Sequence, residues 1–347
     1  MDVTPHAPPV AVDDGGRFRF GCYHTPIYRP DFTRADLSDC FSFWGKGNRR
    51  GPGRWYRALR LKQWHSFVVF SDDWVLSAMI AHFGATSRVH CTLTERDGRA
   101  RHVYERNPAF ARGLSFAESS VRGSSTWRDG SEFMVFEYQP QAGGLWSLSF
   151  NIRLSSALLL KGQVTVHPDE ALALLYPLGT NRAAYTHKEA GNRVEGLLTF
   201  GAQEMRLTMR ARACMDWTRC FPDRKTRCLA LAGGGTTSSG SRLGINLSQG
   251  LYDDAENFAW VDGQPSPLGA VELQAPCVAG DPWRVRGNCI EIEVRPDTRW
   301  DCTVRGFGTR LTASEEYGVA DGTVRVGDVT HTVQGLQTVS VRRDATW

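Results

Sequence analysis

Long hydrophobic runs are missing from this sequence of 347 residues. No segment approaches the ~20 consecutive apolar residues that a membrane-spanning helix needs, which argues against an α-helical membrane protein. The N-terminal segment also lacks the apolar core of a secretory signal, and its acidic residues are unusual in a transit peptide. We therefore expect residues 1–20 to be a disordered, proline-rich leader. We expect a cytoplasmic protein. Contact with the surface of a membrane stays open as an alternative.

Several motifs that mark common enzyme classes are also absent. The nucleophile elbow Gly-x-Ser-x-Gly does not occur, and Gly233–Gly240 lacks the Gly-Lys-Ser/Thr ending of a phosphate-binding loop. The nine histidines include no His-x-x-x-His pair, and the nine cysteines include no Cys-x-x-Cys pair. We therefore expect no metal, no cofactor and reduced thiols.

The sequence also lacks a large excess of positive or negative charge. The net charge is +4, with 41 Lys and Arg against 37 Asp and Glu, and the basic residues are scattered. The densest basic segment, Lys46–Arg54, is rich in glycine and lies between Trp44 and Trp55. We interpret it as a solvated loop in preference to a nucleic-acid site, so no nucleic-acid partner is expected. The oligomeric state stays open.

Short strands separated by turns account for most of what is present. Val89–Glu95 and Arg101–Glu105, for example, flank the hairpin signal Asp97-Gly98. Some fifteen such segments, with turns about every ten residues, predict an all-β protein built from barrels or sandwiches. A chain of this length is typical of two domains of about 150–180 residues each.

One segment has a helical pattern instead. His167–Tyr176 begins with a proline and two acidic residues, which fit a first helical turn, and Pro177 would end the helix. We place the domain boundary close to this segment. The prediction is a first domain over residues 21–185 and a second over residues 186–347.

Asp216 lies in Ala213–Thr226, which begins as the end of a predicted strand and continues into a charged loop. A carboxylate among apolar side chains is either paired with a cation or shifted toward its protonated form. Strand alternation puts Trp217 on the apolar face and Asp216 on the face that carries arginines. We therefore favour an ion pair of Asp216 with Arg219 or Arg224.

Three segments together resemble a known family. They are Tyr185-Thr186-His187-Lys188, then Asp216-Trp217-Thr218-Arg219 with Arg224-Lys225-Thr226, and Gly244–Gly250 with Glu256–Gly263. In order and spacing they are similar to the family called domain of unknown function 2804, from about residue 20 to the end. The resemblance implies two tandem lipocalin-like, calycin-type antiparallel β-barrels with one or two short helices. It also implies a relation in fold to AttH-like proteins, carotenoid hydratases and tocopherol cyclases, but no activity.

The candidate site residues come from these segments. Asp216 is the candidate general acid for hydrating or cyclising an isoprenoid, which requires a dry pocket with aromatic rings around the cation. Tyr185 and His187 are further candidates for acids or hydrogen-bond donors. The expected ligand-binding residues are Lys188, Trp217, Arg219, Asn246, Glu256, Asn257 and Trp260. Each has a structural alternative as a domain junction, an ion pair, a turn or a core residue.

Three functions follow as hypotheses. The first is binding of a hydrophobic small molecule, a lipid or an isoprenoid, because a barrel of about eight strands can enclose one small ligand. The second is an acid-catalysed hydratase or cyclase that uses Asp216. The third is a non-catalytic structural or interaction protein whose barrels are filled by side chains.

Overall fold

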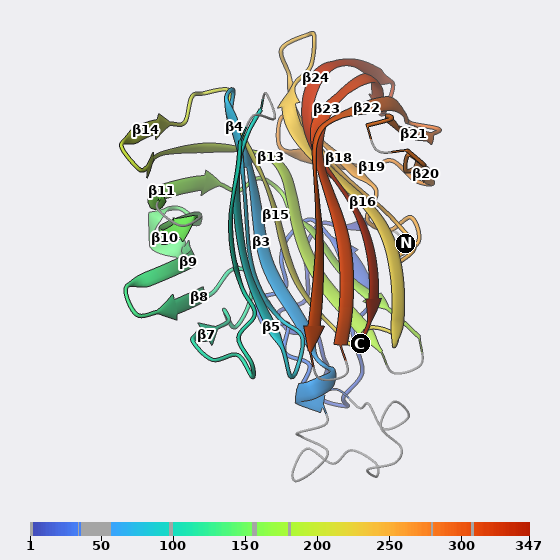
Figure 1. Cartoon of the computed structure of the whole chain (residues 1–347). Coiled ribbons are helices and arrows are strands. Elements are labelled where there is room, and N and C mark those ends of the chain that lie inside the picture. The colour runs from blue at the N-terminus through green and yellow to red at the C-terminus, as the bar shows by residue number, and fades with distance from the viewer. Residues whose placement is uncertain are drawn as a thin grey trace.

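Two large curved β-sheets form the molecule (Figure 1). The computed structural model describes residues 3–33, 35, 57–96, 100–154, 158–179, 182–278, 280–306 and 309–347. Its sheets are antiparallel apart from one short parallel pair, which confirms the predicted all-β class and is consistent with two tandem calycin-like barrels. The basic segment Lys46–Arg54 and the turn Asp97-Gly98 lie outside the described residues. No helix in the described part is long and apolar enough to cross a membrane.

The first sheet contains the strands from the first two-thirds of the chain. Its main strands are β3 (Lys62–Phe70), β4 (Trp74–His82), β5 (Ser87–Glu95), β6 (Arg101–Arg106), β7 (Leu114–Ser115), β8 (Ser124–Asp129), β9 (Glu132–Gln139), β10 (Leu145–Leu154), β11 (Leu158–His167), β13 (Ala183–Phe200) and β15 (Arg212–Cys220). Their order is β6-β5-β4-β3-β15-β13-β11-β10-β9-β8-β7. Off this path lie β1 (Val3–Thr4), β2 (Gly21–Tyr23), β12 (Leu172–Pro177) and β14 (Gln203–Arg206).

The second sheet contains the remaining strands. They are β16 (Lys225–Thr236), β17 (Arg242–Gln249), β18 (Phe258–Val261), β19 (Gln264–Pro267), β20 (Val271–Gln274), β21 (Trp283–Gly287), β22 (Ile290–Gly306), β23 (Thr309–Val326) and β24 (Val329–Thr346). Their order is β19-β18-β17-β16-β24-β23-β22-β21-β20. The last three long strands form a meander that brings the C-terminus back beside β16.

The helix predicted over His167–Tyr176 is wrong. Strand β11 runs to His167, and the apolar run that follows is β12, which pairs with β13 and β2. Leu172 and Leu174 are buried on one side of β12, and Ala173 and Leu175 on the other. A strand buried on both faces has a continuous apolar run, and periodicity alone does not distinguish it from a buried helix. Helical structure in the described part is limited to residues 57–60 and the 3-10 turn Pro140–Ala142.

The N-terminal residues differ from the predicted leader. Residues 3–20 are placed against the first sheet, with β1 paired to β2 and with Ala11 and Val12 fully buried. Ala11 and Val12 are part of a buried hydrophobic cluster of the first sheet, although several prolines precede them in the sequence. The predicted division at residues 185 and 186 falls inside β13, and the chain passes between the sheets at residues 221–224. The division into domains stays a prediction.

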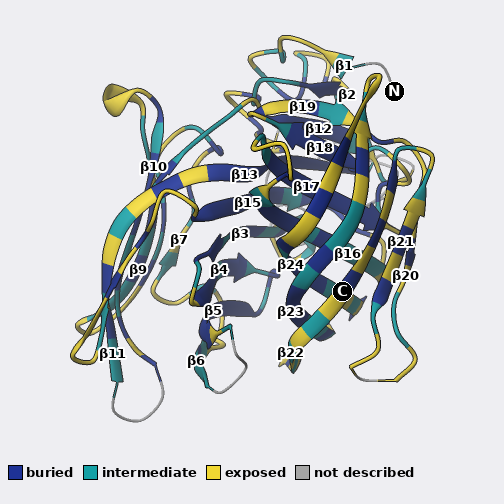
Figure 2. Ribbon diagram, turned by 90° about the horizontal axis from the view of Figure 1, so that it is seen from above, coloured by how far each residue is buried: buried dark blue, intermediate teal, exposed yellow. Residues whose placement is uncertain are grey.

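Buried side chains form three clusters, which we call the first-sheet core, the second-sheet core and the inter-sheet core. The inter-sheet core exists because strands that face the other sheet bury both of their faces. In Figure 2 these are the dark strands β3, β4, β13 and β15 of the first sheet and β17 and β18 of the second. On β15, Met215 and Trp217 face the first-sheet core, whereas Cys214 and Cys220 face the inter-sheet core. The predicted alternation of this strand is therefore kept, but both of its faces are inside the protein.

The sheets approach each other backbone to backbone where β13 meets β17. A Cβ atom on Gly244 would lie 2.1 Å from the carbonyl oxygen of Ala190. Gly191, next to it, has a φ of +75° and lies at a β-bulge of β13. Glycine is required at both positions, because a side chain would separate the sheets or strain the bulge.

Candidate functional site

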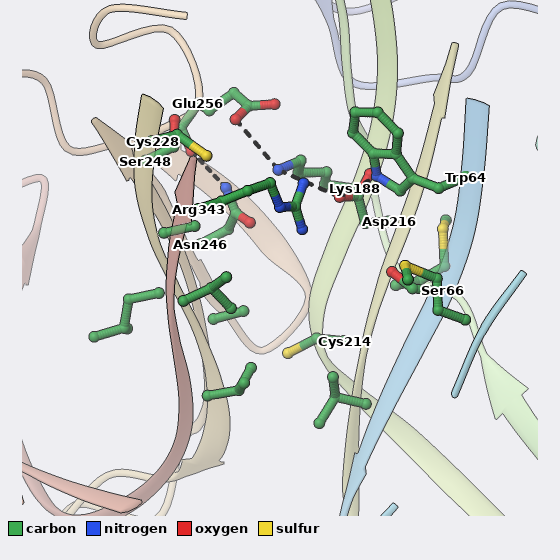
Figure 3. Close-up of a pocket in the computed structure, with 18 of the residues that line it drawn as sticks. Trp64, Ser66, Lys188, Cys214, Asp216, Cys228, Asn246, Ser248, Glu256 and Arg343 are labelled. Atoms are coloured by element: carbon green, nitrogen blue, oxygen red, sulfur yellow. Dashed lines mark hydrogen bonds and ion pairs between the residues drawn. The ribbon is translucent and has the colours of Figure 1, made fainter. Parts of the chain in front are cut away.

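A cavity of about 140 Å³ lies between the two sheets, within the inter-sheet core. Its apolar wall is formed by Val68, Met79, Ala230, Ala232, Leu251, Val339 and Val341. Its polar lining includes Trp64, His90, Lys188, Asp216, Asn246, Ser248, Tyr252, Glu256, Glu315 and Arg343. The labelled charged side chains gather toward one end of the view in Figure 3. The cavity therefore combines an apolar wall with a charged end.

Lys188 occupies the centre of this charged end. It is paired across the ladder with Asp216, because the two residues are register partners on β13 and β15. Its Nζ donates to Glu256 Oε2 at 3.2 Å and lies 3.7 Å from Asp216 Oδ2. Burial opposes the charge of Lys188, but the two carboxylates outweigh burial and raise the pKa of its ammonium group. One cation thus links a carboxylate of the first sheet to one from the β17–β18 connection.

Glu256 is the most deeply buried acid of the site, with 1% of the residue exposed. Burial raises the pKa of its carboxyl group; Lys188 lowers it in part, and Asp216 raises it further. Oxygen Oε1 has no partner in hydrogen-bonding geometry among the described residues, although the Ser248 hydroxyl lies close enough to oppose the rise. Glu256 is therefore the acid of this site that is shifted toward its neutral form.

Asn246 and Asn257 hold the connection that carries Glu256. Asn246 Nδ2 donates to the Glu256 carbonyl oxygen at 2.8 Å. Asn257 Oδ1 accepts from the Ser248 backbone at 2.8 Å, and its Nδ2 donates to Gly269. The predicted residues of this segment are thus close together, but Asn257 supports the loop and does not line the cavity.

Asp216 points into the inter-sheet space, with 28% of its side chain exposed. Trp64 Nε1 donates to its Oδ2 at 3.0 Å, and Thr218 Oγ1 donates to its Oδ1 at 2.6 Å. Both oxygens are therefore acceptors. This arrangement suits a carboxylate that acts as a hydrogen-bond acceptor and anchors the strands, in preference to a proton donor.

The structure replaces the predicted ion pair of Asp216 with Arg219 or Arg224 by the pair with Lys188. Arg219 is an odd-numbered residue of β15 and lies on the opposite face of the strand from Asp216. Its guanidinium lies 5.1 Å from the centre of the Trp217 ring and donates to the backbone of Pro30. Asp216 and Arg219 are close in sequence, but their side chains lie on opposite faces of β15, because successive side chains of a strand point in opposite directions.

Tyr185 and His187 are separated from Asp216 for the same reason. They lie on the face of β13 opposite Lys188, which is the face that packs against the first-sheet core. The Tyr185 hydroxyl accepts from the Ile27 backbone at 2.9 Å, and burial raises the pKa of this phenol. His187 Nε2 lies 2.8 Å from Glu189 Oε1.

The predicted residues therefore divide between two places. Lys188, Asp216, Asn246 and Glu256 line the inter-sheet cavity. Trp217 packs against Tyr185 within the first-sheet core. Trp260 belongs to the inter-sheet core, where its Nε1 donates to the Glu170 backbone at 2.8 Å, but it does not line the cavity.

Arg343 is an important cavity residue that the sequence-based prediction does not include. Its guanidinium lies 5.7 Å from the centre of the Trp64 ring. A signal for it does exist, because alternation along β24 puts Arg343 on the same face as Val339 and Val341. An arginine that continues an apolar stripe is expected to face the same interior space.

His90 is a second cavity residue missing from the prediction. It stacks on Trp300 at 4.5 Å, and neither of its ring nitrogens has a hydrogen-bond partner in the described structure. Burial, with Arg88 and Arg101 adding to it, lowers the pKa of its imidazole well below the usual value. His90 is therefore neutral at the cavity wall.

Within the described ranges, no group of three or more His, Cys, Asp or Glu side chains is arranged to hold a metal ion. The expectation that the protein uses no metal and no cofactor stays a prediction. The same holds for the expected lack of a nucleic-acid partner.

Comparison with known proteins adds a family and a fold. A family model described as "Domain of unknown function (DUF2804)" matches residues 12–345. No curated protein matches the sequence significantly. Among solved structures, CghA with Sch210972 is similar at a TM-score of 0.50 and 12% identity, covering 81% of this chain and 88% of CghA.

Two further structures are similar at lower scores. A putative AttH protein from Nitrosomonas europaea has a TM-score of 0.49 and 13% identity, covering 84% of this chain and 93% of its own. Kievitone hydratase from Nectria haematococca has a TM-score of 0.45 and 9% identity, covering 82% and 88%. At these identities the similarity concerns the fold alone.

Proposed function

The chain belongs to the family described as domain of unknown function (DUF2804), and we propose that it binds a hydrophobic small molecule in the cavity between its two sheets. The observation that carries this proposal is the composition of the cavity. Valine, leucine, methionine and alanine side chains form one wall, and charged groups gather toward one end. Ligand sites for small molecules combine an apolar lining with a few polar groups in this way.

Unsatisfied polar atoms support the proposal. In the described structure, Glu256 Oε1, the Tyr252 hydroxyl, Arg343 Nε and both ring nitrogens of His90 lack hydrogen-bond partners, and all four residues line the same cavity. A buried polar group without a partner costs about 1–3 kcal/mol. A cavity of purely structural origin is better filled by apolar side chains, whereas a ligand with a polar end would satisfy several of these groups.

The size of the cavity sets a condition on binding. A volume of about 140 Å³ is below the ~300–1,000 Å³ of typical ligand sites. An isoprenoid therefore requires side chains at the wall to change rotamer, and the unbranched Met79 is suited to this. CghA, which is similar in fold, has been crystallised with the small molecule Sch210972, and this supports small-molecule binding as a use of the fold.

A second candidate function is proton transfer to an apolar substrate, as in a hydratase or a cyclase. The observation that favours it is the raised pKa of Glu256 beside an apolar wall. A neutral Glu256 would protonate an alkene, and Trp64 and Tyr252 would face the resulting cation. Water would add to this cation and give an oxonium that loses a proton to the Glu256 carboxylate. In a cyclase, a second alkene would attack the cation instead, and the new cation formed would lose a C–H proton to the same carboxylate. Glu256 thus takes the acid role that the sequence suggested for Asp216.

Filling the cavity tests the first proposal. Ala232 lies at the cavity wall on β16, and Ala232→Trp would occupy the space, whereas Ala202→Trp adds the same side chain at the exposed β13–β14 turn. Using geraniol as the probe, isothermal titration of the full chain should show binding that Ala232→Trp weakens at least tenfold and Ala202→Trp leaves unchanged. Equal affinity in both variants, with both folded by circular dichroism, would place the binding elsewhere and refute the proposal.

A further inference from the structure

We propose that the ligand of the inter-sheet cavity is an apolar monocarboxylic acid whose carboxylate is bound by Arg343. This inference rests on the proposed ligand-binding function and specifies the chemistry of the ligand. It is carried by the partners of the charged side chains at the cavity.

Arg343 differs from Lys188, the other cation that lines the cavity. Lys188 Nζ contacts Glu256 and Asp216 at 3.2 and 3.7 Å, and Glu315 accepts a hydrogen bond from Tyr317 at 3.3 Å. Arg343 has no ion pair within 4.0 Å and no hydrogen bond among the described residues; its one contact of this kind is the ring of Trp64. Arg343 is partly exposed, and its buried Nε has no hydrogen-bond partner in the described structure. A guanidinium that lines a cavity without a hydrogen-bonded partner is able to bind an anionic group there.

The neighbouring carboxylates attract Arg343 but form no ion pair with it within 4.0 Å. Burial lowers the pKa of its guanidinium, but Cys228, Asp216 and Glu315 outweigh burial and raise this pKa. Asp216 is held by Trp64 Nε1 and Thr218 Oγ1 at 3.0 and 2.6 Å, in addition to Lys188. Glu256 is directed toward Lys188. Figure 3 shows the guanidinium of Arg343 reaching into the space between the sheets, close to this pair, with no dashed line that joins it to either carboxylate.

The chemistry of a guanidinium selects the partner. Its planar set of N–H donors matches a carboxylate in two parallel hydrogen bonds. A phosphate or diphosphate group would bring two or more negative charges to a place that already contains Asp216, Glu256 and Glu315 with only Lys188 and Arg343 as lining cations. A single carboxylate adds the smallest charge that pairs Arg343. The apolar wall of Val339 and Val341, on the same face of β24, then contacts the hydrocarbon part.

Geranic acid and geraniol test this inference, because they share a hydrocarbon chain and differ in the carboxylate. For the full chain, isothermal titration should give geranic acid an affinity roughly ten- to hundredfold higher than geraniol, the range expected for a charged hydrogen-bonded contact. Arg343→Met should remove this preference and change the affinity for geraniol less than threefold. Arg343→Lys keeps the charge without the planar donors and should give an intermediate affinity for the acid.

The exposed neighbour Arg342 provides the matched control, because its side chain lies on the other face of β24 and donates to the Pro276 backbone. Arg342→Met should bind both probes as the unaltered chain does. If geraniol and geranic acid bind equally well, or if Arg343→Met keeps the preference for the acid, the inference is wrong while the proposed function stands. If neither probe binds, the proposed function fails together with the inference.

Discussion

Replacing Lys188 by methionine should destabilise the protein in a way that depends on pH. The substitution keeps most of the side-chain volume but leaves Glu256, which is 1% exposed, without its cation. Asp216 retains the hydrogen bonds from Trp64 and Thr218, so the main cost falls on Glu256. Removing one partner of a buried ion pair costs about 3–5 kcal/mol.

The loss of unfolding free energy in Lys188→Met can also be calculated from the difference in the pKa of Glu256 between the unfolded and the folded state. Without Lys188, the folded state is expected to keep this carboxyl group neutral. Each pH unit above the unfolded pKa of about 4.3 then costs about 1.4 kcal/mol, which gives about 3.7 kcal/mol at pH 7 and about 1 kcal/mol at pH 5. The sign follows from the raised folded pKa, because such a group loses its stabilising contribution as the pH rises. The deficit of Lys188→Met should therefore shrink toward acid pH.

Urea-induced unfolding, followed by tryptophan fluorescence at pH 5 and pH 7, measures this deficit. The control is Lys161→Met on the exposed face of β11, which should remain within about 0.5 kcal/mol of the unaltered chain. The double variant with Glu256→Gln should recover about 2 kcal/mol of the loss at pH 7, because an amide needs no proton to be neutral. A deficit below 0.5 kcal/mol at pH 7, or one that grows at pH 5, would refute this account of the pair.

Two further substitutions test the sheet contact and the candidate acid. Gly244→Ala should lower stability by about 3 kcal/mol in the same urea experiment, because its Cβ would lie 2.1 Å from the carbonyl oxygen of Ala190; a loss below 1 kcal/mol would contradict the close approach. Geraniol incubated with the chain tests the catalytic alternative by mass spectrometry of a hydrated product. If a product forms, Glu256→Gln should abolish it and Asp216→Asn should leave more than a tenth; the reverse result would return the acid role to Asp216.

The sequence predicts the kind of fold better than the arrangement of the site. Alternation along Arg212–Cys220 places Trp217 and Asp216 on opposite faces, and the structure keeps this division. It cannot show that both faces are buried, because the second face is covered by strands from the other sheet. The run Leu172–Leu175 is misassigned as helical for the same reason, since a strand covered on both faces loses its period of two.

The candidate site follows the same rule. Lys188 and Asp216 are both among the predicted residues and are brought together by the register of β13 and β15. Tyr185 and His187 belong to the same linear motif as Lys188, yet their side chains point to the other side of the sheet. Arg343 joins the site from a strand more than a hundred residues after Lys188 and Asp216 in the sequence, and no local pattern predicts a contact over such a distance.

The most direct test of the inter-sheet site is a crystal structure of the full chain with geranic acid. The account predicts the hydrocarbon chain between β24 and the strands of the first sheet, against Val339 and Val341, with the carboxylate on the guanidinium of Arg343. A molecule bound inside the first-sheet core, beside Tyr185 and His187, would contradict the account and assign the ligand to the other group of predicted residues.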